Sequence, residues 1–151
     1  MEYRVATAGD IGAMVRLRKK LVEECGVPDQ DTDGDLRAFF EKKLVDGSLV
    51  EWLCIEDGQA VASAAIMFYE FVPSRTNPSG LRGYVTNMYT APEHRRKGIA
   101  TLLLGKLVEE AKARGVQRLW LHATGMGQPV YLKFGFKETG GWLEMKDILG
   151  L

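Results

Sequence analysis

The feature that most constrains this chain lies at residues 84–101, which run YVTNMYTAPEHRRKGIAT. The first half alternates as a strand does and a helical pattern begins after Gly98, so the chain must turn a tight corner between them. The first turn of a helix presents unpaired backbone N–H groups, and Gly98 lacks the Cβ that would hold a ligand away from them. Three basic residues, Arg95, Arg96 and Lys97, add positive charge at the same point. The corner therefore predicts a site for a phosphate or pyrophosphate.

Apolar periodicity divides the rest of the chain into short strands and helices. The expected strands lie at residues 3–6, 49–55, 60–71, 82–89, 118–123, 136–137 and 142–147. The expected helices lie at residues 10–24, 32–46, 98–114 and in a short segment that carries Tyr131. Three strands follow one another in the middle of the chain, which excludes a purely alternating, doubly wound sheet. The order predicts a single α/β domain, residues 1–151, with a mixed sheet and helices on both faces.

Local signals mark several boundaries and faces. Asp57-Gly58 predicts a hairpin turn, and Thr32 with Asp35 resembles a capping box at the start of the second helix. Gly105 lies inside the third helix, where close packing is its expected reason. The expected inward-facing residues of the second and third helices are Leu36, Phe39, Phe40, Leu44, Val45, Ile99, Leu102, Leu103, Leu107, Val108 and Ala111.

Composition excludes several classes of protein. Twenty basic residues balance twenty acidic ones, so no overall field favours nucleic acid. No run of about 18 uncharged apolar residues predicts a membrane span. Met1 is followed by charged Glu2 and Arg4 rather than by the apolar stretch of a signal peptide, so we expect a cytoplasmic location. Cys25 and Cys54 lack partners at ligand spacing, which predicts neither a metal site nor a disulfide framework.

Two motifs in the second half of the chain together resemble signatures of the GNAT N-acetyltransferase family. Arg95-x-x-Gly98-x-Ala100, between a strand and an amphipathic helix, is similar to the acetyl-CoA motif of that family. Residues 131–136, YLKFGF, match its Tyr-x-x-x-Gly-Phe motif. The resemblance implies the GNAT fold, in which two adjacent parallel strands splay to admit the cofactor. Here those strands would be residues 84–89 and 118–123.

The resemblance also implies acetyl-CoA as the cosubstrate. The residues that it assigns to cofactor binding are Met88, Tyr89, Thr90, Arg95, Arg96, Lys97, Gly98, Ile99, Ala100 and Thr101. Backbone amides from Arg96 onward would hold the pyrophosphate, and Met88 and Thr90 would pair with the pantetheine arm like an added strand. A solvated basic turn or a small nucleic-acid patch is the alternative for residues 94–97, although the neutral net charge argues against nucleic acid.

Tyr131 is the expected catalytic residue, because the Tyr of the family motif acts as the general acid that protonates the leaving CoA thiolate. A purely packed aromatic beside Phe134 and Phe136 is the alternative. The reaction implied is direct attack of an amine on the thioester, with a backbone N–H near Met88 facing the oxyanion. The general base is left open between water and three polar residues of the expected strands: Glu70, His122 and Glu144.

The sequence does not specify the acceptor. A primary amine of a small molecule or peptide fits, and the acidic segment at residues 29–35 is only a weak indication of a cationic acceptor. A module that senses CoA or mediates an interaction without turnover is the alternative to an enzyme, but a positioned Tyr131 favours the enzyme. No nucleic acid or membrane is expected as a partner, and a homodimer is possible.

Overall fold

Five strands form one mixed sheet in the order β1-β2-β3-β4-β5. Their bounds are β1 (Glu2–Val5), β2 (Leu49–Glu56), β3 (Gln59–Glu70), β4 (Leu81–Thr90) and β5 (Leu119–Trp120). The first four strands pair antiparallel, and β5 pairs parallel to β4. This computed structural model describes residues 1–28 and 31–150, so Asp29 of the predicted acidic segment lies outside the described residues.

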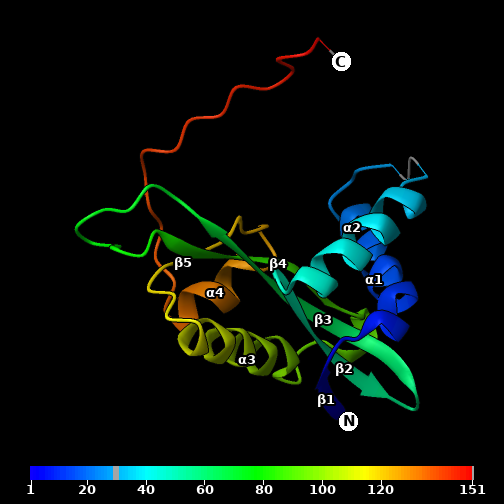
Figure 1. Cartoon of the computed structure of the whole chain (residues 1–151). Coiled ribbons are helices and arrows are strands. Elements are labelled where there is room, and N and C mark those ends of the chain that lie inside the picture. The colour runs from blue at the N-terminus through cyan, green and yellow to red at the C-terminus, as the bar shows by residue number, and fades with distance from the viewer. Residues whose placement is uncertain (29–30, 151) are drawn as a thin grey trace.

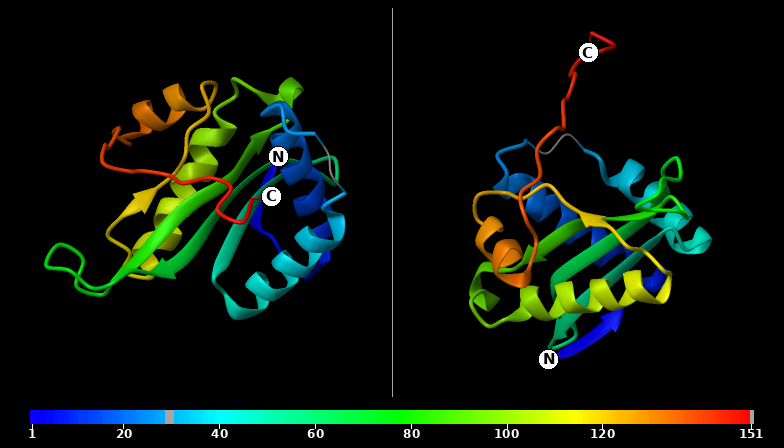
Figure 2. Two further views of the ribbon diagram at one scale, coloured as in Figure 1. Left: turned by 90° about the horizontal axis from the view of Figure 1, so that it is seen from above. Right: turned by 90° about the vertical axis from the view of Figure 1, so that its left-hand side faces the viewer.

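Helices cover both faces of the sheet (Figures 1 and 2). α1 (Ile11–Glu24) and α2 (Asp33–Asp46) lie on one face, and α3 (Ile99–Ala113) and α4 (Gln128–Phe134) lie on the other. Each face has its own hydrophobic cluster: Met14 and Phe40 belong to the first, Ile66 and Leu107 to the second. The predicted mixed sheet between two helical layers is confirmed.

The β2–β3 hairpin forms where the sequence predicts it. Asp57 and Gly58 have φ angles of 49° and 75°, the left-handed values that a two-residue hairpin turn of the primed type requires. The hairpin brings β3 to the middle of the sheet, where it pairs along most of its length with β4. The long, continuous pairing of these strands fixes the position of β4, from which the candidate site is built.

β4 pairs with β5 only through Gly83 with Leu119 and Tyr84 with Trp120, although β4 continues to Thr90. The predicted strand at residues 118–123 is therefore too long, since only two of its residues pair. Past Tyr84 the two parallel strands separate. This is the place at which the GNAT resemblance predicts splayed strands.

Some predicted details of the helices are wrong. Val45 is 89% exposed and Leu102 is 41% exposed, while Leu104 is fully buried. The reason is helical geometry: side chains four residues apart share a face, and a neighbour one position away is rotated by about 100°. The expected capping box also fails, because the Thr32 side chain makes no capping hydrogen bond.

The predicted hairpin at residues 136–137 and 142–147 is also wrong. No residue described after Phe134 lies in a helix or strand, and residues 137–150 are all exposed. This C-terminal arm, residues 137–150, projects from the sheet on the side opposite α3 and α4 (Figures 1 and 2). Gly140-Gly141 therefore does not close a turn that would return the chain to its own sheet.

Gly105 in α3 and Gly83 in β4 give a matched test of how tightly side chains pack around the sheet. Gly105 has no atom within 4 Å of the position of an added Cβ, so close packing is not its reason, whereas a Cβ on Gly83 would lie 2.6 Å from the Leu119 side chain. We expect Gly105→Ala to raise the free energy of unfolding by about 0.5–1 kcal/mol, because alanine favours a helix interior. We expect Gly83→Ala to lower it by roughly 1–3 kcal/mol through overpacking. Urea unfolding of both variants measures this, and the opposite order of stability would contradict the packing described here.

Candidate active site

The corner between β4 and α3 contains two residues with left-handed backbone conformations. Arg96 has φ 62° and Gly98 has φ 78°. Gly98 caps the N-terminus of α3, and its carbonyl oxygen accepts a hydrogen bond of 3.1 Å from the Leu102 N–H. No atom lies within 4 Å of the position that a Cβ would take at residue 98. The first turn of α3 thus borders open space and offers its unpaired N–H groups there.

Arg95 connects this corner to α1. Its Nε donates to the Thr90 carbonyl oxygen over 2.8 Å, and one terminal nitrogen donates to both Glu24 carboxylate oxygens over 2.6 and 2.8 Å. The charge of Arg95 is therefore balanced by Glu24. Arg96 and Lys97 are exposed and supply the positive charge of the corner.

A cavity of about 970 Å³ opens between the end of β4, the start of α3 and α4. Its lining includes nearly the whole predicted site: Met88, Tyr89, Thr90, Arg95, Arg96, Gly98, Ile99, Ala100, Thr101 and Tyr131. Lys97 does not line it. A second cavity of similar volume lies between α1 and α2 and contains none of these residues.

Tyr131 lies in α4 and contributes its ring to the wall of the cavity. The ring packs edge to face against Phe136 at 6.1 Å, and a Cβ on Gly127 would lie 3.0 Å from it. Burial raises the pKa of the Tyr131 hydroxyl to about 12, with a smaller electrostatic contribution from Tyr84. The phenol is therefore protonated at neutral pH and able to donate a proton.

A bulge interrupts β4 beside this cavity. The register between β3 and β4 shifts between Ser63 and Ala65, so two residues of β4, Asn87 and Met88, lie opposite one residue of β3. Asn87 has φ 53°, and its carbonyl oxygen accepts a hydrogen bond of 2.8 Å from the Ser63 hydroxyl. A bulge leaves a residue outside the regular ladder, which makes a backbone N–H available at this position.

These features match the two motifs that the sequence places at the corner and on α4. Residues 14–136 match the Acetyltransferase (GNAT) family. This chain belongs to that family. The membership and the fold predicted from the two motifs are confirmed.

A solved structure shows the same fold over nearly the whole chain. It is the crystal structure of a predicted acetyltransferase with acetyl-CoA from Clostridium acetobutylicum, 44% identical in sequence. The likeness covers 98% of this chain and 97% of the other, with a TM-score of 0.94.

Two curated relatives share only part of their length with this chain. GCN5-related N-acetyltransferase 6, chloroplastic, from Arabidopsis thaliana is 37% identical over 70 residues, which are 43% of this chain and 24% of the relative. The uncharacterized N-acetyltransferase YsnE from Bacillus subtilis (strain 168) is 37% identical over 60 residues, 36% of this chain and 40% of the relative. The chain thus spans less than half of either relative, and both are named N-acetyltransferases, as the sequence predicts for this chain.

The three candidate bases of this GNAT protein occupy different settings. Glu70 is exposed at the end of β3, and Glu144 is exposed in the C-terminal arm. The His122 Nδ1 lies 3.0 Å from the Tyr84 hydroxyl, within hydrogen-bond distance. His122 is exposed as well, and none of the three candidates lines the cavity that contains Tyr131.

Sequence reasoning missed a buried polar network behind the β4 bulge. Arg18 donates to the Asn87 Oδ1, and the Asn87 Nδ2 donates to the Glu51 Oε2, each over 3.2 Å. The other carboxylate oxygen of Glu51 makes no hydrogen bond to the described residues, and the side chain is fully buried. A glutamate at the centre of an otherwise apolar strand, LVEWLCI, is the signal that could have identified it.

Neither a metal centre nor a membrane span is found in the part of the chain that the structure describes. Residues 1–28 and 31–150 contain no group of three or more His, Cys, Asp or Glu side chains that could hold a metal ion. Within the same ranges, no helix is both long and apolar enough to cross a bilayer.

Glu51 gives the site a testable dependence on pH. Burial raises its pKa from 4.5 to about 8, against smaller opposing effects of Asn87 and Arg18. Between these values the folded protein keeps a proton that the unfolded chain releases, so stability falls as the pH rises through this range. We expect Glu51→Gln to match wild type near pH 4.5 and to become more stable than wild type toward pH 8, by up to ~1.4 kcal/mol per pH unit.

Urea unfolding at several pH values measures this difference. Glu70→Gln is the matched control, because Glu70 is an exposed glutamate on the neighbouring strand. A constant difference in stability between Glu51→Gln and wild type across the pH range would show that Glu51 does not titrate in this way.

Proposed function

We propose that this protein transfers the acetyl group of acetyl-CoA directly to a primary amine of a small molecule or peptide. One observation supports this most: a single cavity unites the Gly98 corner, suited to a pyrophosphate, with the protonated Tyr131 hydroxyl. The crystal structure of the relative from Clostridium acetobutylicum contains acetyl-CoA, which supports acetyl-CoA as the cosubstrate here.

In this proposal the pyrophosphate binds to backbone amides at the start of α3, from Arg96 to Thr101. Helix N-termini favour anions through their free N–H groups and the helix dipole. The exposed Arg96 and Lys97 add charge, while Arg95 fixes the shape of the corner through Glu24 and the Thr90 carbonyl. Side chains therefore matter less here than the backbone path that Gly98 permits.

The pantetheine arm has a place along β4. Beyond Tyr84 no strand of the described residues pairs with the β5 side of β4, so an extended amide chain can lie there as an added strand. Met88 and Thr90 border this opening and also line the cavity. In this proposal the pantetheine arm runs from the corner of α3 toward Tyr131, with the thioester between the bulge and the phenol.

The chemical step requires one bond to form and one to break. The amine nitrogen attacks the thioester carbonyl carbon, and the C–S bond breaks with its electron pair going to sulfur. The Tyr131 hydroxyl gives its proton to that sulfur, and a backbone N–H of the β4 bulge near Met88 faces the oxygen that gains charge. Burial raises the pKa of the Tyr131 phenol and makes it a weaker acid. The same burial raises the pKa of a CoA thiol beside it, because a thiolate is also disfavoured out of water. The proton transfer from the phenol to the sulfur therefore stays feasible.

The attacking amine must be neutral, so its ammonium form loses a proton first. Among the three candidate bases we favour His122, directly or through water, because of its contact with Tyr84. A cytoplasmic location and the class of amine remain predictions from the sequence. The alternative, a module that binds CoA without turnover, does not explain why α4 holds a partly buried phenol in the cavity with Gly127 making room for it.

The test of this function is the initial rate of thiol release from acetyl-CoA with a panel of amines, for wild type and Tyr131→Phe. Phenylalanine keeps the packing of the ring and removes the proton donor. We expect kcat to fall roughly 10²–10⁴-fold, with acetyl-CoA affinity measured by calorimetry nearly unchanged. Tyr3→Phe on β1 is the matched control and should keep wild-type turnover.

Two outcomes would count against the proposal in different ways. If the Tyr131→Phe variant turned over within about threefold of wild type, Tyr131 would not be the general acid, and solvent would protonate the leaving thiolate. Tight binding of acetyl-CoA with no thiol release for any amine would favour the binding module over the enzyme.

A further inference from the structure

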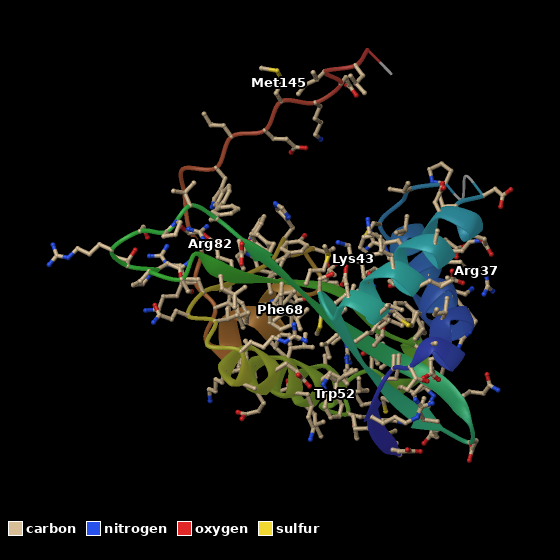
Figure 3. All side chains as sticks on the ribbon, in the orientation of Figure 1. Arg37, Lys43, Trp52, Phe68, Arg82 and Met145 are labelled. Atoms are coloured by element: carbon tan, nitrogen blue, oxygen red, sulfur yellow. The ribbon has the colours of Figure 1, made fainter. Side chains whose placement is uncertain are left out.

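Glu51 occupies a position where the rest of its strand predicts an apolar residue. Leu49 and Leu53, two positions before and after it on β2, share its face of the strand and belong to the hydrophobic cluster beneath α1 and α2. The next residue, Trp52, lies on the opposite face, where its indole N–H donates to Glu110 of α3 over 3.1 Å (Figure 3). Glu51 therefore places a carboxyl group inside an apolar layer, and the acetyl transfer proposed above does not use it.

The hydrogen bonds of Glu51 lead to the bulge in β4. Its Oε2 accepts from the side-chain amide of Asn87, and the oxygen of that amide accepts from Arg18 on α1, each over 3.2 Å. The backbone carbonyl of Asn87 accepts from the Ser63 hydroxyl over 2.8 Å. The side chain and the backbone of Asn87 are thus both held, by partners on β2, α1 and β3.

This network lies behind the cofactor cavity and not in its wall. Met88, the residue after Asn87, lines the cavity, whereas Glu51, Asn87 and Arg18 do not. Glu51 is fully buried and Asn87 is 6% exposed, so both are shielded from a ligand in the cavity. Any effect of these side chains on acetyl transfer must therefore pass through the backbone at residues 87 and 88.

The peptide group between Asn87 and Met88 shows how such an effect can pass. It is planar and trans, so its carbonyl and its N–H point in opposite directions. The carbonyl is bound to Ser63 on β3, which directs the Met88 N–H away from β3 and toward the open side of β4. Asn87 must keep φ at 53° for this orientation, a value that a residue with a Cβ adopts only when its surroundings hold it there.

We propose that Arg18 and Glu51 are positioning residues for acetyl transfer: by binding the oxygen and the nitrogen of the Asn87 side-chain amide, they keep the Met88 N–H directed at the thioester oxygen. This role rests on the proposed function, because it concerns the oxyanion of the same reaction. A hydrogen bond to an oxyanion is short and directional, so a bulge that relaxes by about 1 Å loses much of its effect on the transition state.

The role requires an acceptor at position 51 and a donor at position 18. Burial raises the pKa of Glu51 to about 8, so at neutral pH the side chain is largely a neutral acid, which glutamine imitates. Glu51→Gln keeps an oxygen for the Asn87 amide, and Arg18→Lys keeps a donor. Glu51→Leu and Arg18→Met keep much of the side-chain volume and remove the polar group.

The first test measures kcat for thiol release and the calorimetric Kd for acetyl-CoA in these four variants. We expect Glu51→Leu and Arg18→Met to lower kcat roughly 10–100-fold with Kd nearly unchanged, because the pyrophosphate corner is separate from the bulge. Glu51→Gln and Arg18→Lys should restore most of the turnover. Leu49→Ala is the matched control: it removes a buried side chain from the same face of β2, so it should lower the free energy of unfolding and leave kcat unchanged.

The second test is a double-mutant cycle with Asn87→Gly. Glycine adopts a positive φ without strain and carries no amide, so Glu51→Leu should have little further effect on kcat in the Asn87→Gly background. The double variant also leaves no unpaired Asn87 amide behind, which keeps the test usable if Glu51→Leu alone does not fold.

A third measurement needs no acceptor and so separates this inference from the proposed function. The infrared carbonyl stretch of bound acetyl-CoA, labelled with ¹³C at the thioester carbon, should lie at lower frequency than in free acetyl-CoA, because an N–H donates to that oxygen. The shift should be lost in Glu51→Leu and Arg18→Met and kept in Glu51→Gln and Leu49→Ala. A wild type that shows this pattern but releases no thiol would contradict the proposed function alone.

Three results would overturn the positioning role. The first is wild-type kcat and an unchanged carbonyl frequency in both Glu51→Leu and Arg18→Met. The second is an equal loss from Glu51→Leu with and without the Asn87 side chain, since the effect would then not pass through Asn87. The third is a Glu51→Gln variant as slow as Glu51→Leu, because the carboxyl group would then be needed for proton transfer and not as an acceptor.

Discussion

Among the described residues, β4 pairs with β5 through only two residue pairs, Gly83 with Leu119 and Tyr84 with Trp120. The site proposed for the cofactor depends on this pairing stopping at Tyr84. Because β4 continues to Thr90 without β5 beside it, one side of β4 is open to an extended ligand. The chain then reaches the corner at Gly98 within eight residues of the end of β4. The same early ending leaves β5 as a two-residue strand at the edge of the sheet.

The opening beside β4 depends on polar groups that a simple sheet would not contain. Asn87 adopts a left-handed conformation, which costs about 1 kcal/mol or more for a residue with a Cβ, and the structure around it must offset that cost. Ser63 and Arg18 donate hydrogen bonds to Asn87, and Glu51 accepts one from it, so the partners come from three other elements. A buried carboxyl is expensive unless it is protonated or paired, so its presence behind the bulge indicates that the bulge has a use.

Local patterns predicted much of this, and contacts between distant segments account for what they missed. The corner at Gly98 and the placement of Tyr131 lie within short motifs, so the sequence alone located both, and helical periodicity placed the helices of both layers. Glu51 could not be assigned a role, because its partners come from α1 and β4, far away in the sequence. The arm was predicted as half of a hairpin since its residues do favour a strand. The pattern does not specify a partner strand, and residues 142–147 pair with none of the described residues.

The central claim is that the amides at the start of α3 hold the pyrophosphate of acetyl-CoA. Calorimetric titration of the protein with acetyl-CoA, with dephospho-acetyl-CoA, which lacks only the 3′-phosphate, and with S-acetylpantetheine, which lacks the pyrophosphate and the 3′-phosphoadenosine, tests it most directly. Several charge-assisted hydrogen bonds are lost with the pyrophosphate, so we expect S-acetylpantetheine to bind at least ~100-fold more weakly than dephospho-acetyl-CoA. Equal affinity for these two compounds would contradict the account and place the binding energy elsewhere in the cavity.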